Sequence, residues 1–184
     1  MSEITPGITN GRCSTAPLDK TISAERVRKL FSYDSETGHF YWRAKSNNNG
    51  ANEGDLAGSL NGNGYRNIGI DGLSYKAHRL AWLLTKGEWP TGELDHVDGN
   101  RSNNAISNLR IATRSQNNSN ARRRYNNVSG FKGVSFHKGD KRWRATIYVN
   151  KKCRHLGSFL SATEAHAAYC RAARELHGEF ARFE

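Results

Sequence analysis

The sequence predicts an α+β fold made of small modules, and three observations lead to this prediction. Strand-like alternation and helix-like spacing of apolar residues follow each other along the 184-residue chain. Hydrophobic residues make up 36% and the mean hydropathy is −0.79, which is low for one large core. Charge is segregated, with seven basic and seven acidic residues over 1–60 but eleven basic residues and one acid over 120–155. We expect N-terminal strands and a helix, a central strand–turn–strand–helix unit, and a C-terminal three-stranded antiparallel sheet packed on one helix.

The basic charge favours a polyanionic partner. The net charge is +11 and the pI is near 9.9. Within 120–155 the basic residues interleave with Phe131, Phe136, Trp143 and Tyr148 in a strand-like pattern. This pattern favours a nucleic-acid-binding face over a merely solvated basic surface.

The N-terminal third predicts short elements around loops. Residues 1–20 lack periodicity and are expected to be a flexible leader. Ser23 is placed to cap a short helix over 23–31, and an aromatic strand follows over 39–43. Residues 45–63 are rich in Asn and Gly and predict a long loop.

A hairpin and a helix come next. Residues 65–75 alternate around Asp71-Gly72, a dipeptide suited to a two-residue turn. Residues 77–86 predict a helix with a leucine face. His78 and Arg79 lie on its first turn, where a phosphate contact and packing against a strand are equally compatible with the sequence, so no catalytic role is assigned to either.

The central stretch, Leu94–Asn120, carries the residue types that point to chemistry. Asp95 and His96 end a short strand, and the turn through Asn104 is expected to be too hydrophilic for the core. A return strand over 109–112 places Asn108 at its entrance. Thr113-x-x-Gln116 is a capping-box pattern, so a helix should begin there and carry Asn117 in its first turn.

These types suit phosphodiester hydrolysis when they meet at one end of the unit. A neutral imidazole such as His96 is a competent base near neutral pH. The Asp95 carboxylate and an amide oxygen, completed by water and phosphate, suit Mg²⁺ better than Zn²⁺. Asn108 is better placed to fix the turn, and so to aim His96, than to bind metal. Each residue alone has an ordinary structural explanation, and only their combination favours an active site.

The stretch HRLAWLL…LDHVDGNRSNNAISNLRIATRSQNNSN resembles HNH endonucleases of the ββα-metal type, in the branch of phage and intron-encoded homing enzymes. The resemblance covers roughly residues 65–120, and we expect an HNH nuclease domain over 21–120 with an N-terminal β-hairpin extension and a Mg²⁺ or Mn²⁺ cofactor. It implies that His96 is the general base, that Asn108 holds the loop, and that Asp95 and Asn117 are metal ligands. Many family members have His where Asn117 stands, so Asn117 and neighbouring Asn118 both remain candidates for the ligand.

The C-terminal stretch predicts a second module. A basic linker over 121–129, in which Arg122–Arg124 extend the preceding helix, leads to strands over 131–137, 142–149 and 153–159. Ser161-x-x-Glu164 opens a helix that ends at Gly178.

Residues 130–183 resemble an AP2 DNA-binding domain, through the Trp-x-Ala-x-Ile and Leu-Gly-x-Phe strands and the Glu-Ala-x-x-Ala-Tyr helix, so we expect an AP2-like domain over 130–184. The resemblance implies a sheet face that binds double-stranded DNA, although its base preference cannot be carried over. The expected DNA-binding residues, with the linker arginines, are Lys132, Ser135, His137, Arg142, Arg144, Tyr148, Arg154, His155, Arg122, Arg123 and Arg124.

Composition also bounds the compartment and the assembly. Cys13, Cys153 and Cys170 have no C-x2-C zinc spacing and no disulfide framework, which fits a reducing cytoplasm. No signal peptide or membrane span is predicted. We expect a monomer or a homodimer on DNA, nicking if monomeric and cutting both strands if dimeric.

Two other functions compete with a nuclease. One is a sequence-specific DNA-binding regulator in which the HNH-like segment is catalytically inactive. The other is a structural or RNA-associated basic protein, which leaves the Asp95, His96, Asn108 and Asn117 arrangement unexplained. A degenerate nuclease is expected to have lost at least one of these four residues, and all four are present.

Overall fold

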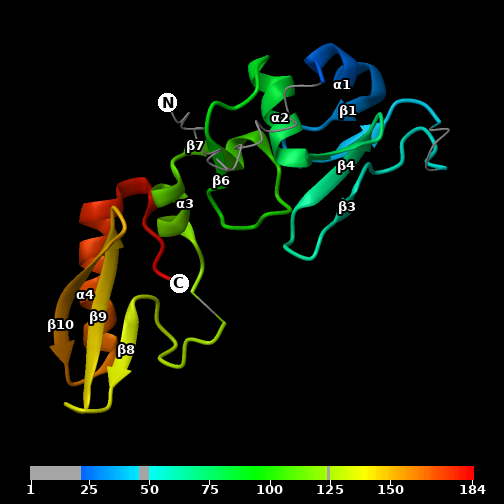
Figure 1. Cartoon of the computed structure of the whole chain (residues 1–184). Coiled ribbons are helices and arrows are strands. Elements are labelled where there is room, and N and C mark those ends of the chain that lie inside the picture. The colour runs from blue at the N-terminus through cyan, green and yellow to red at the C-terminus, as the bar shows by residue number, and fades with distance from the viewer. Residues whose placement is uncertain (1–21, 46–49, 124) are drawn as a thin grey trace, which may run out of the picture.

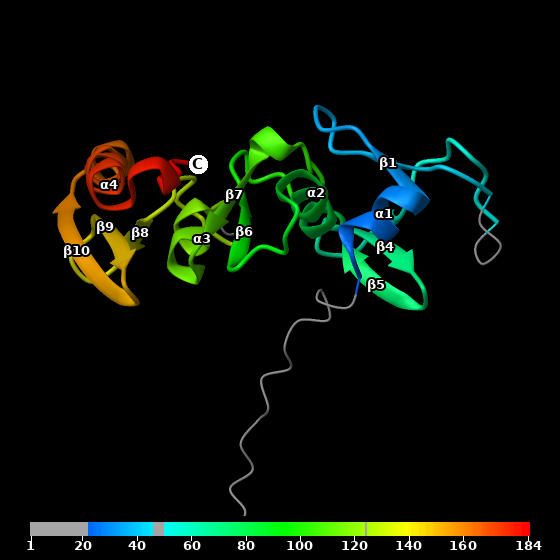
Figure 2. The ribbon, with the colours of Figure 1, turned by 90° about the horizontal axis from the view of Figure 1, so that it is seen from above.

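The computed structural model describes residues 22–45, 50–123 and 125–184. The predicted leader over 1–20 and Arg124 of the predicted linker lie outside these residues. The described elements form three blocks along one line, with the central strand pair and helix between an N-terminal block and a C-terminal sheet (Figures 1 and 2). The observed folds are mixed α and β, as predicted.

The N-terminal block contains two helices and two small antiparallel sheets. Strands β1 and β2 form one sheet, and strands β3, β4 and β5 form the other in that order. The elements are α1 (Ala24–Leu30), β1 (Phe31–Tyr33), β2 (Phe40–Trp42), β3 (Ser59–Leu60), β4 (Arg66–Ile70), β5 (Leu73–Lys76) and α2 (Ala77–Lys86).

Local chemistry explains most of this block. The Ser23 side chain accepts a hydrogen bond from the Arg26 N–H and so caps α1, as predicted. Asp71 and Gly72 both have positive φ angles, 51° and 79°, as the predicted two-residue turn requires. Two expectations were wrong in detail. Phe31 starts β1 rather than ending the helix, and β3 lies within the predicted loop because it pairs with β4.

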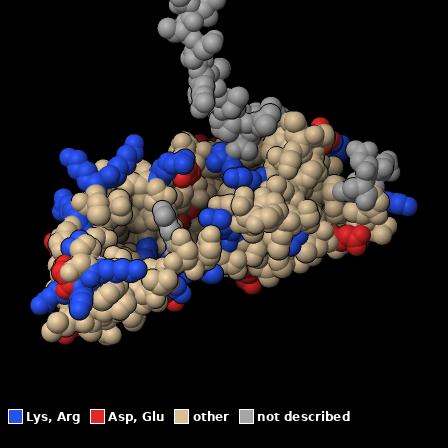
Figure 3. Space-filling view, turned by 60° about the horizontal axis from the view of Figure 1, so that its bottom comes forward, with Lys and Arg blue, Asp and Glu red and all other residues tan. Residues whose placement is uncertain are grey.

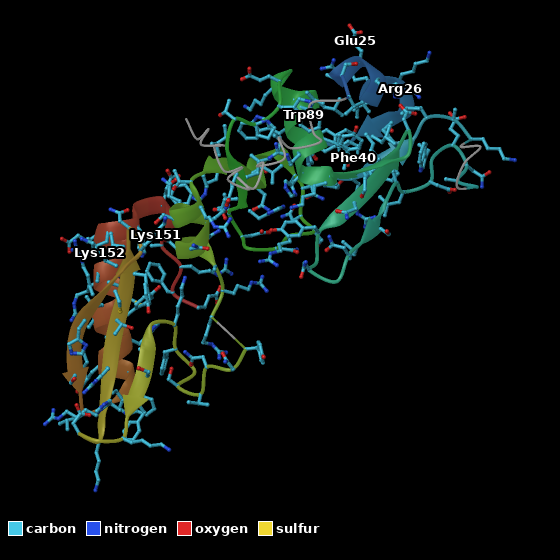
Figure 4. The ribbon with its side chains drawn as sticks, viewed as in Figure 1. Glu25, Arg26, Phe40, Trp89, Lys151 and Lys152 are labelled. Carbon is cyan, nitrogen blue, oxygen red and sulfur yellow. The ribbon has the colours of Figure 1, made fainter. Side chains whose placement is uncertain are left out.

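One apolar core holds the N-terminal block together. Its largest fully buried side chains include Phe31, Phe40, Ile68 and Leu80. Phe40 lies inside this block, beneath α1 and α2 (Figure 4). Leu109 of the central block packs against the same core, which fixes the central strands relative to the N-terminal sheets.

The central block is a strand pair followed by a helix. It contains β6 (Glu93–His96), the 3₁₀ turn η2 (Ile106–Asn108), β7 (Leu109–Ala112) and α3 (Arg114–Asn120). The complete capping box between Thr113 and Gln116 confirms the predicted start of the helix. Ala121 is already extended, so Arg122 and Arg123 do not prolong α3, contrary to the expectation.

The C-terminal block is a three-stranded antiparallel sheet in the order β10–β9–β8, packed on one helix, as predicted. Strand β8 begins three residues later than expected. The elements are β8 (Val134–His137), β9 (Arg142–Val149), β10 (Lys152–Phe159), α4 (Ala162–His177) and the 3₁₀ turn η3 (Gly178–Phe180).

The strand register separates the two faces of this sheet. Ala145 and Ile147 are buried against α4. Because side chains alternate along a strand, Arg144 and Tyr148 leave β9 on the opposite face. Residues paired across neighbouring strands project from the same face of a sheet. Ser135 pairs with Arg144 and therefore also lies on the face away from the helix. His137 and Arg142 are paired on this same face, as is His155 through its partner Thr146.

Two residues expected on this open face lie elsewhere. Arg154 pairs with Ile147, so it leaves β10 on the helix side. Lys132 precedes the sheet, and its Nζ donates a 2.6 Å hydrogen bond to the Ser119 carbonyl of α3. Burial lowers the pKa of Lys132 to about 8. The placement of Lys132 and Arg154 on the open face was therefore wrong.

Over the ranges that the structure describes, no helix has the length and apolar character needed to cross a bilayer. Both described cysteines, Cys153 and Cys170, are free thiols.

His78 of α2 is buried at the contact between the N-terminal and central blocks. Only 5% of its surface is exposed, and its ring lies 5.3 Å from Tyr65 and 5.1 Å from His96. The packing alternative for His78 is therefore the one observed. Burial, reinforced by the nearby charges of His96, Lys76 and Arg79, lowers the pKa of His78 to about 2.

This burial predicts acid sensitivity of the fold. The unfolded chain protonates His78 near pH 6.5 but the folded chain does so only near 2, so stability should fall as pH drops below about 6.5. In His78→Gln the dependence of unfolding free energy on pH between 6 and 4 should flatten by about 1.4 kcal/mol per pH unit. Urea unfolding at several pH values measures this slope. His155→Gln, on the exposed sheet, should keep the wild-type slope, and an unchanged slope in His78→Gln would contradict the assignment.

Candidate active site

The β6–β7 ribbon positions the residues singled out in the sequence. Asp95 lies opposite Arg110, and His96 lies opposite Leu109. Neighbouring side chains leave a strand on opposite faces, so Asp95 is directed to α3 while His96 is directed to the N-terminal block. Both nevertheless line one cleft of about 850 Å³ at the end of the ribbon, together with Asn117 of α3. The expected convergence of these three residues on one cleft is observed.

The Asp95 carboxylate is buried and held from two sides. Arg110 contacts Asp95 Oδ2 through Nε at 2.9 Å and through Nη2 at 2.8 Å. The amide nitrogen of Asn120 lies 3.0 Å from each carboxylate oxygen. The carboxylate is thus fixed in orientation, with Oδ1 the less occupied of its two oxygens among the described residues.

His96 is buried and oriented by an asparagine. Its Nε2 lies 3.3 Å from Asn104 Oδ1, and the Asn104 amide nitrogen donates to the Ser102 carbonyl at 3.2 Å, which assigns the oxygen of Asn104 to His96. Nε2 then carries the proton, and Nδ1 keeps the lone pair. Burial lowers the pKa of His96, against the opposing effects of Asn104 and of Asp98 and Asp95. The imidazole is therefore neutral at pH 7.

Asn104 is itself fully buried, although its loop was expected to stay out of the core. The loop reaches the interior because it packs on the N-terminal turn. Gly38 there has a φ of 75°, and a Cβ at this position would collide with the backbone of Asn104 and Ala105. Tyr33 also donates a hydrogen bond of 2.9 Å to the Asn104 carbonyl. Backbone-to-backbone packing of this kind has no hydrophobic signature in the sequence.

Asn108 joins the two ends of the turn between β6 and β7. Its Oδ1 accepts from the Asp98 N–H at 3.0 Å, and its Nδ2 donates to Asp98 Oδ1 and to the Asn103 carbonyl, both at 2.9 Å. Its carbonyl accepts from the Val97 N–H. These bonds hold Asn103, and therefore its neighbour Asn104, beside His96.

Helix α3 presents three asparagines near Asp95, with different surroundings. Asn120 is buried, and its nitrogen also donates to the His96 carbonyl at 2.8 Å, so three oxygen atoms surround this one donor. A carbonyl oxygen would be repelled there, so Asn120 is a fixed donor and not an oxygen ligand. Asn117 is more exposed and donates to Glu93 Oε2 at 2.7 Å, which leaves its oxygen to serve as a ligand. Asn118 also lines the cleft.

The donor set fits a hard divalent cation held by few protein ligands. Asp95 and Glu93 are two residues apart on β6 and so share a face, with Asn117 beside Glu93. Carboxylate and amide oxygens are preferred by Mg²⁺, which keeps several waters and is completed by substrate phosphate. In the described ranges no three His, Cys, Asp or Glu side chains cluster as a closed metal cage would require.

Basic and aromatic side chains form the walls of the cleft. Tyr65 and Arg101 line one side of the cleft, where the Tyr65 ring lies 6.0 Å from the His96 ring and the Arg101 guanidinium lies 5.0 Å from the centre of the Tyr65 ring. Across the cleft, the α3 side supplies Arg114, Arg122 and Arg123. Lys and Arg side chains lie on both sides of the hollowed part of the molecular face shown in Figure 3.

Sequence reasoning missed four residues of this site. Arg110 and Asn120 hold Asp95, Asn104 holds His96, and Tyr65 lines the cleft. Arg110 could have been found from the sequence, because the predicted pairing of the two strands places it opposite Asp95, fifteen residues earlier. Several asparagines in the turn and on α3 are alike in sequence, so nothing separated Asn104 and Asn120 from their neighbours.

Comparisons with known proteins bear on this geometry. Residues 75–119, which span α2, the β6–β7 ribbon and nearly all of α3, match the family model described as HNH endonuclease. The chain is 40% identical over 113 residues to "Protein 3.8" of Escherichia phage T7, covering 59% of this chain and 93% of the phage protein. It is 32% identical over 106 residues to an "Uncharacterized HNH endonuclease L560" of Acanthamoeba polyphaga mimivirus, covering 56% of this chain and 54% of that relative. No solved structure matches significantly.

The family match falls on the elements that build the cleft, and the phage relative is matched over almost its whole length. Family membership implies a nuclease that acts on DNA. The chain belongs to the HNH endonuclease family.

Proposed function

We propose that this protein is a homing-type, metal-dependent DNA endonuclease that hydrolyses phosphodiester bonds at the cleft beside β6. The observation that carries the proposal is the meeting of Asp95, His96 and Asn117 in one cleft with basic walls. A neutral base, hard oxygen ligands and a positively charged channel are what hydrolysis of a polyanionic backbone needs.

His96 acts as the general base in this mechanism. Its Nδ1 lone pair takes a proton from a water that attacks the phosphorus atom, while the proton on Nε2 stays there, hydrogen-bonded to Asn104 Oδ1. Asn104 and Asn108 keep the ring in this tautomer through the turn that they close. The depressed pKa keeps the ring able to accept a proton at neutral pH.

Asp95 and Asn117 would hold a single Mg²⁺ or Mn²⁺ ion. Such an ion stabilises negative charge on the leaving oxygen as a Lewis acid. Asn120 and Arg110 fix the Asp95 carboxylate, and Glu93 fixes the nitrogen of Asn117, so both oxygens are oriented before DNA arrives. Fixed ligands lower the reorganisation needed when the substrate binds.

The C-terminal block is proposed to be an AP2-like module that binds double-stranded DNA through the open face of its sheet. Asp140 accepts hydrogen bonds from Arg144 at 3.0 Å and from His137 at 2.9 Å, and so orders both on this face. The Arg144 contact, then that of His137, lowers the pKa of Asp140 to about 2. The proposed DNA-binding residues on this face are Ser135, His137, Arg142, Arg144, Tyr148 and His155, with Arg122 and Arg123 at the cleft.

With one proposed active site in each chain, the number of DNA strands that are cut depends on how many chains bind the target together. A monomer on DNA should nick one strand, whereas a homodimer should cut both. The basic walls around the cleft and the separate sheet face support a division of labour, in which the central block cleaves and the C-terminal block selects or anchors the site.

The role of His96 is tested by cleavage of supercoiled plasmid with Mg²⁺ or with EDTA. We expect cleavage that depends on Mg²⁺ and falls about 100-fold or more in His96→Ala, because general base catalysis contributes about that factor. DNA binding should persist in the variant. His39→Gln, in the N-terminal hairpin, should cleave like the wild type, and undiminished activity of His96→Ala would exclude His96 as the base.

The role of the sheet is tested by DNA affinity at several salt concentrations. Arg144→Ala should weaken binding and reduce the slope of log affinity against log salt by about one unit, as loss of one phosphate contact predicts. Arg154→Ala removes the same charge from the helix side of the same sheet and should keep the wild-type slope. Equal slopes in the two variants would show that the open face does not bind the backbone.

A further inference from the structure

The C-terminal block is docked on the central block through contacts that surround the candidate site. The His177 ring nitrogen lies 3.3 Å from the Ser119 hydroxyl, and Lys132 donates to the Ser119 carbonyl. The guanidinium of Arg182 lies against Gly99 in the turn that follows His96, where a Cβ would collide with it. The Arg123 N–H donates to the Glu184 carbonyl at 3.4 Å.

Arg110 contacts both sides of this interface. Through Nε and Nη2 it holds Asp95 Oδ2. Through Nη1 it donates to the Glu179 carbonyl at 2.9 Å, and its guanidinium carbon lies 3.7 Å from the centre of the Phe180 ring. Its side chain is 16% exposed, and that of Asp95 is 7% exposed. One planar group therefore links the carboxylate of the cleft to turn η3 of the C-terminal block.

We propose that Arg110 is a positioning residue through which the docked η3 turn sets the orientation of the Asp95 carboxylate, so that the C-terminal block completes the nuclease site. This inference rests on the proposed function, in which Asp95 holds a divalent ion. It adds a second role for the C-terminal block, beyond contact with DNA.

The geometry gives the physical reason. A guanidinium is rigid and planar, so stacking of its face on Phe180 and hydrogen bonding of Nη1 to Glu179 fix the direction in which Nε and Nη2 point. Asp95 Oδ2 accepts a hydrogen bond from Nε and forms an ion pair with Nη2 at 2.8 Å, while Asn120 lies 3.0 Å from both carboxylate oxygens. Together these contacts set the rotation of the carboxylate. Groups that orient a metal-binding carboxylate change metal affinity without touching the ion.

Two substitutions test this without changing the net charge near Asp95. Arg110→Lys keeps the cation but lacks the planar fork, and Phe180→Leu keeps an apolar side chain but removes the ring face. The matched control is Phe183→Leu, because Phe183 lies in the same C-terminal segment but is stacked by Arg174 of α4, at 4.9 Å. Circular dichroism and urea unfolding establish that each full-length variant is folded.

The first readout is Mn²⁺ affinity of the DNA-free protein, measured by electron paramagnetic resonance titration. Arg110→Lys and Phe180→Leu should each bind Mn²⁺ about tenfold more weakly, the usual size of such indirect effects. Phe183→Leu should bind Mn²⁺ like the wild type. Single-turnover DNA cleavage should likewise be slower in Arg110→Lys and Phe180→Leu and unchanged in Phe183→Leu. Wild-type Mn²⁺ affinity in folded Arg110→Lys and Phe180→Leu would overturn the proposal.

The second readout uses the reciprocity of coupled equilibria. If docking of η3 favours the ion, the ion must favour docking of η3. Mg²⁺ should slow amide hydrogen exchange over 178–181 in the wild type and in Phe183→Leu, but not in Arg110→Lys. If the wild-type protein binds Mn²⁺ but its hydrogen exchange over 178–181 is insensitive to Mg²⁺, the inference about Arg110 is overturned while the proposed function stands. Failure of the wild type to bind Mn²⁺ or to cleave would instead overturn the proposed function and the inference with it.

Discussion

The ion pair between Asp95 and Arg110 joins parts of the molecule that are far apart in sequence. Asp95 and Arg110 pair across the β6–β7 ribbon. Asn120 of α3 donates a hydrogen bond to Asp95, and Arg110 contacts Glu179 and Phe180 of the C-terminal block. Removing one partner of such a buried pair leaves an uncompensated charge and typically costs about 3–5 kcal/mol. Neither Asp95 nor Arg110 can therefore be removed alone without a large loss of stability. The orientation of the Asp95 carboxylate depends on Arg110 and on the residues that contact Arg110.

Buried amides perform the remaining positioning. Asn104 orients His96, Asn108 closes the turn that supports Asn104, and Asn120 ties Asp95 to the backbone of His96. A side chain with one donor group and one acceptor group can satisfy neighbouring backbone atoms without adding a net charge beside the carboxylate. A neutral network of this kind fixes the base and the carboxylate while leaving cationic charge for the walls of the cleft, where the phosphate backbone is proposed to bind.

The sequence predicted what local rules determine. Helix α2, strand β9 and the capping box of α3 follow from periodicity and from N-cap chemistry, and they were found at the expected residues. It did not predict what depends on long-range contacts. Asn104 is buried because another turn packs on its backbone, Lys132 turns to α3 because the blocks dock, and Arg154 faces the helix because of its register with β9.

The cleft between β6 and α3 is proposed to hold a divalent ion with the help of the Asn117 oxygen. The most direct test is the Mg²⁺ concentration at half-maximal single-turnover cleavage, compared between Asn117→Ala and Asn118→Ala. These neighbours have the same side chain on the same helix, and both line the cleft. We expect Asn117→Ala to need about tenfold more Mg²⁺ while Asn118→Ala matches the wild type. A shift in Asn118→Ala alone, or in neither variant, would contradict a role for the Asn117 oxygen as a ligand.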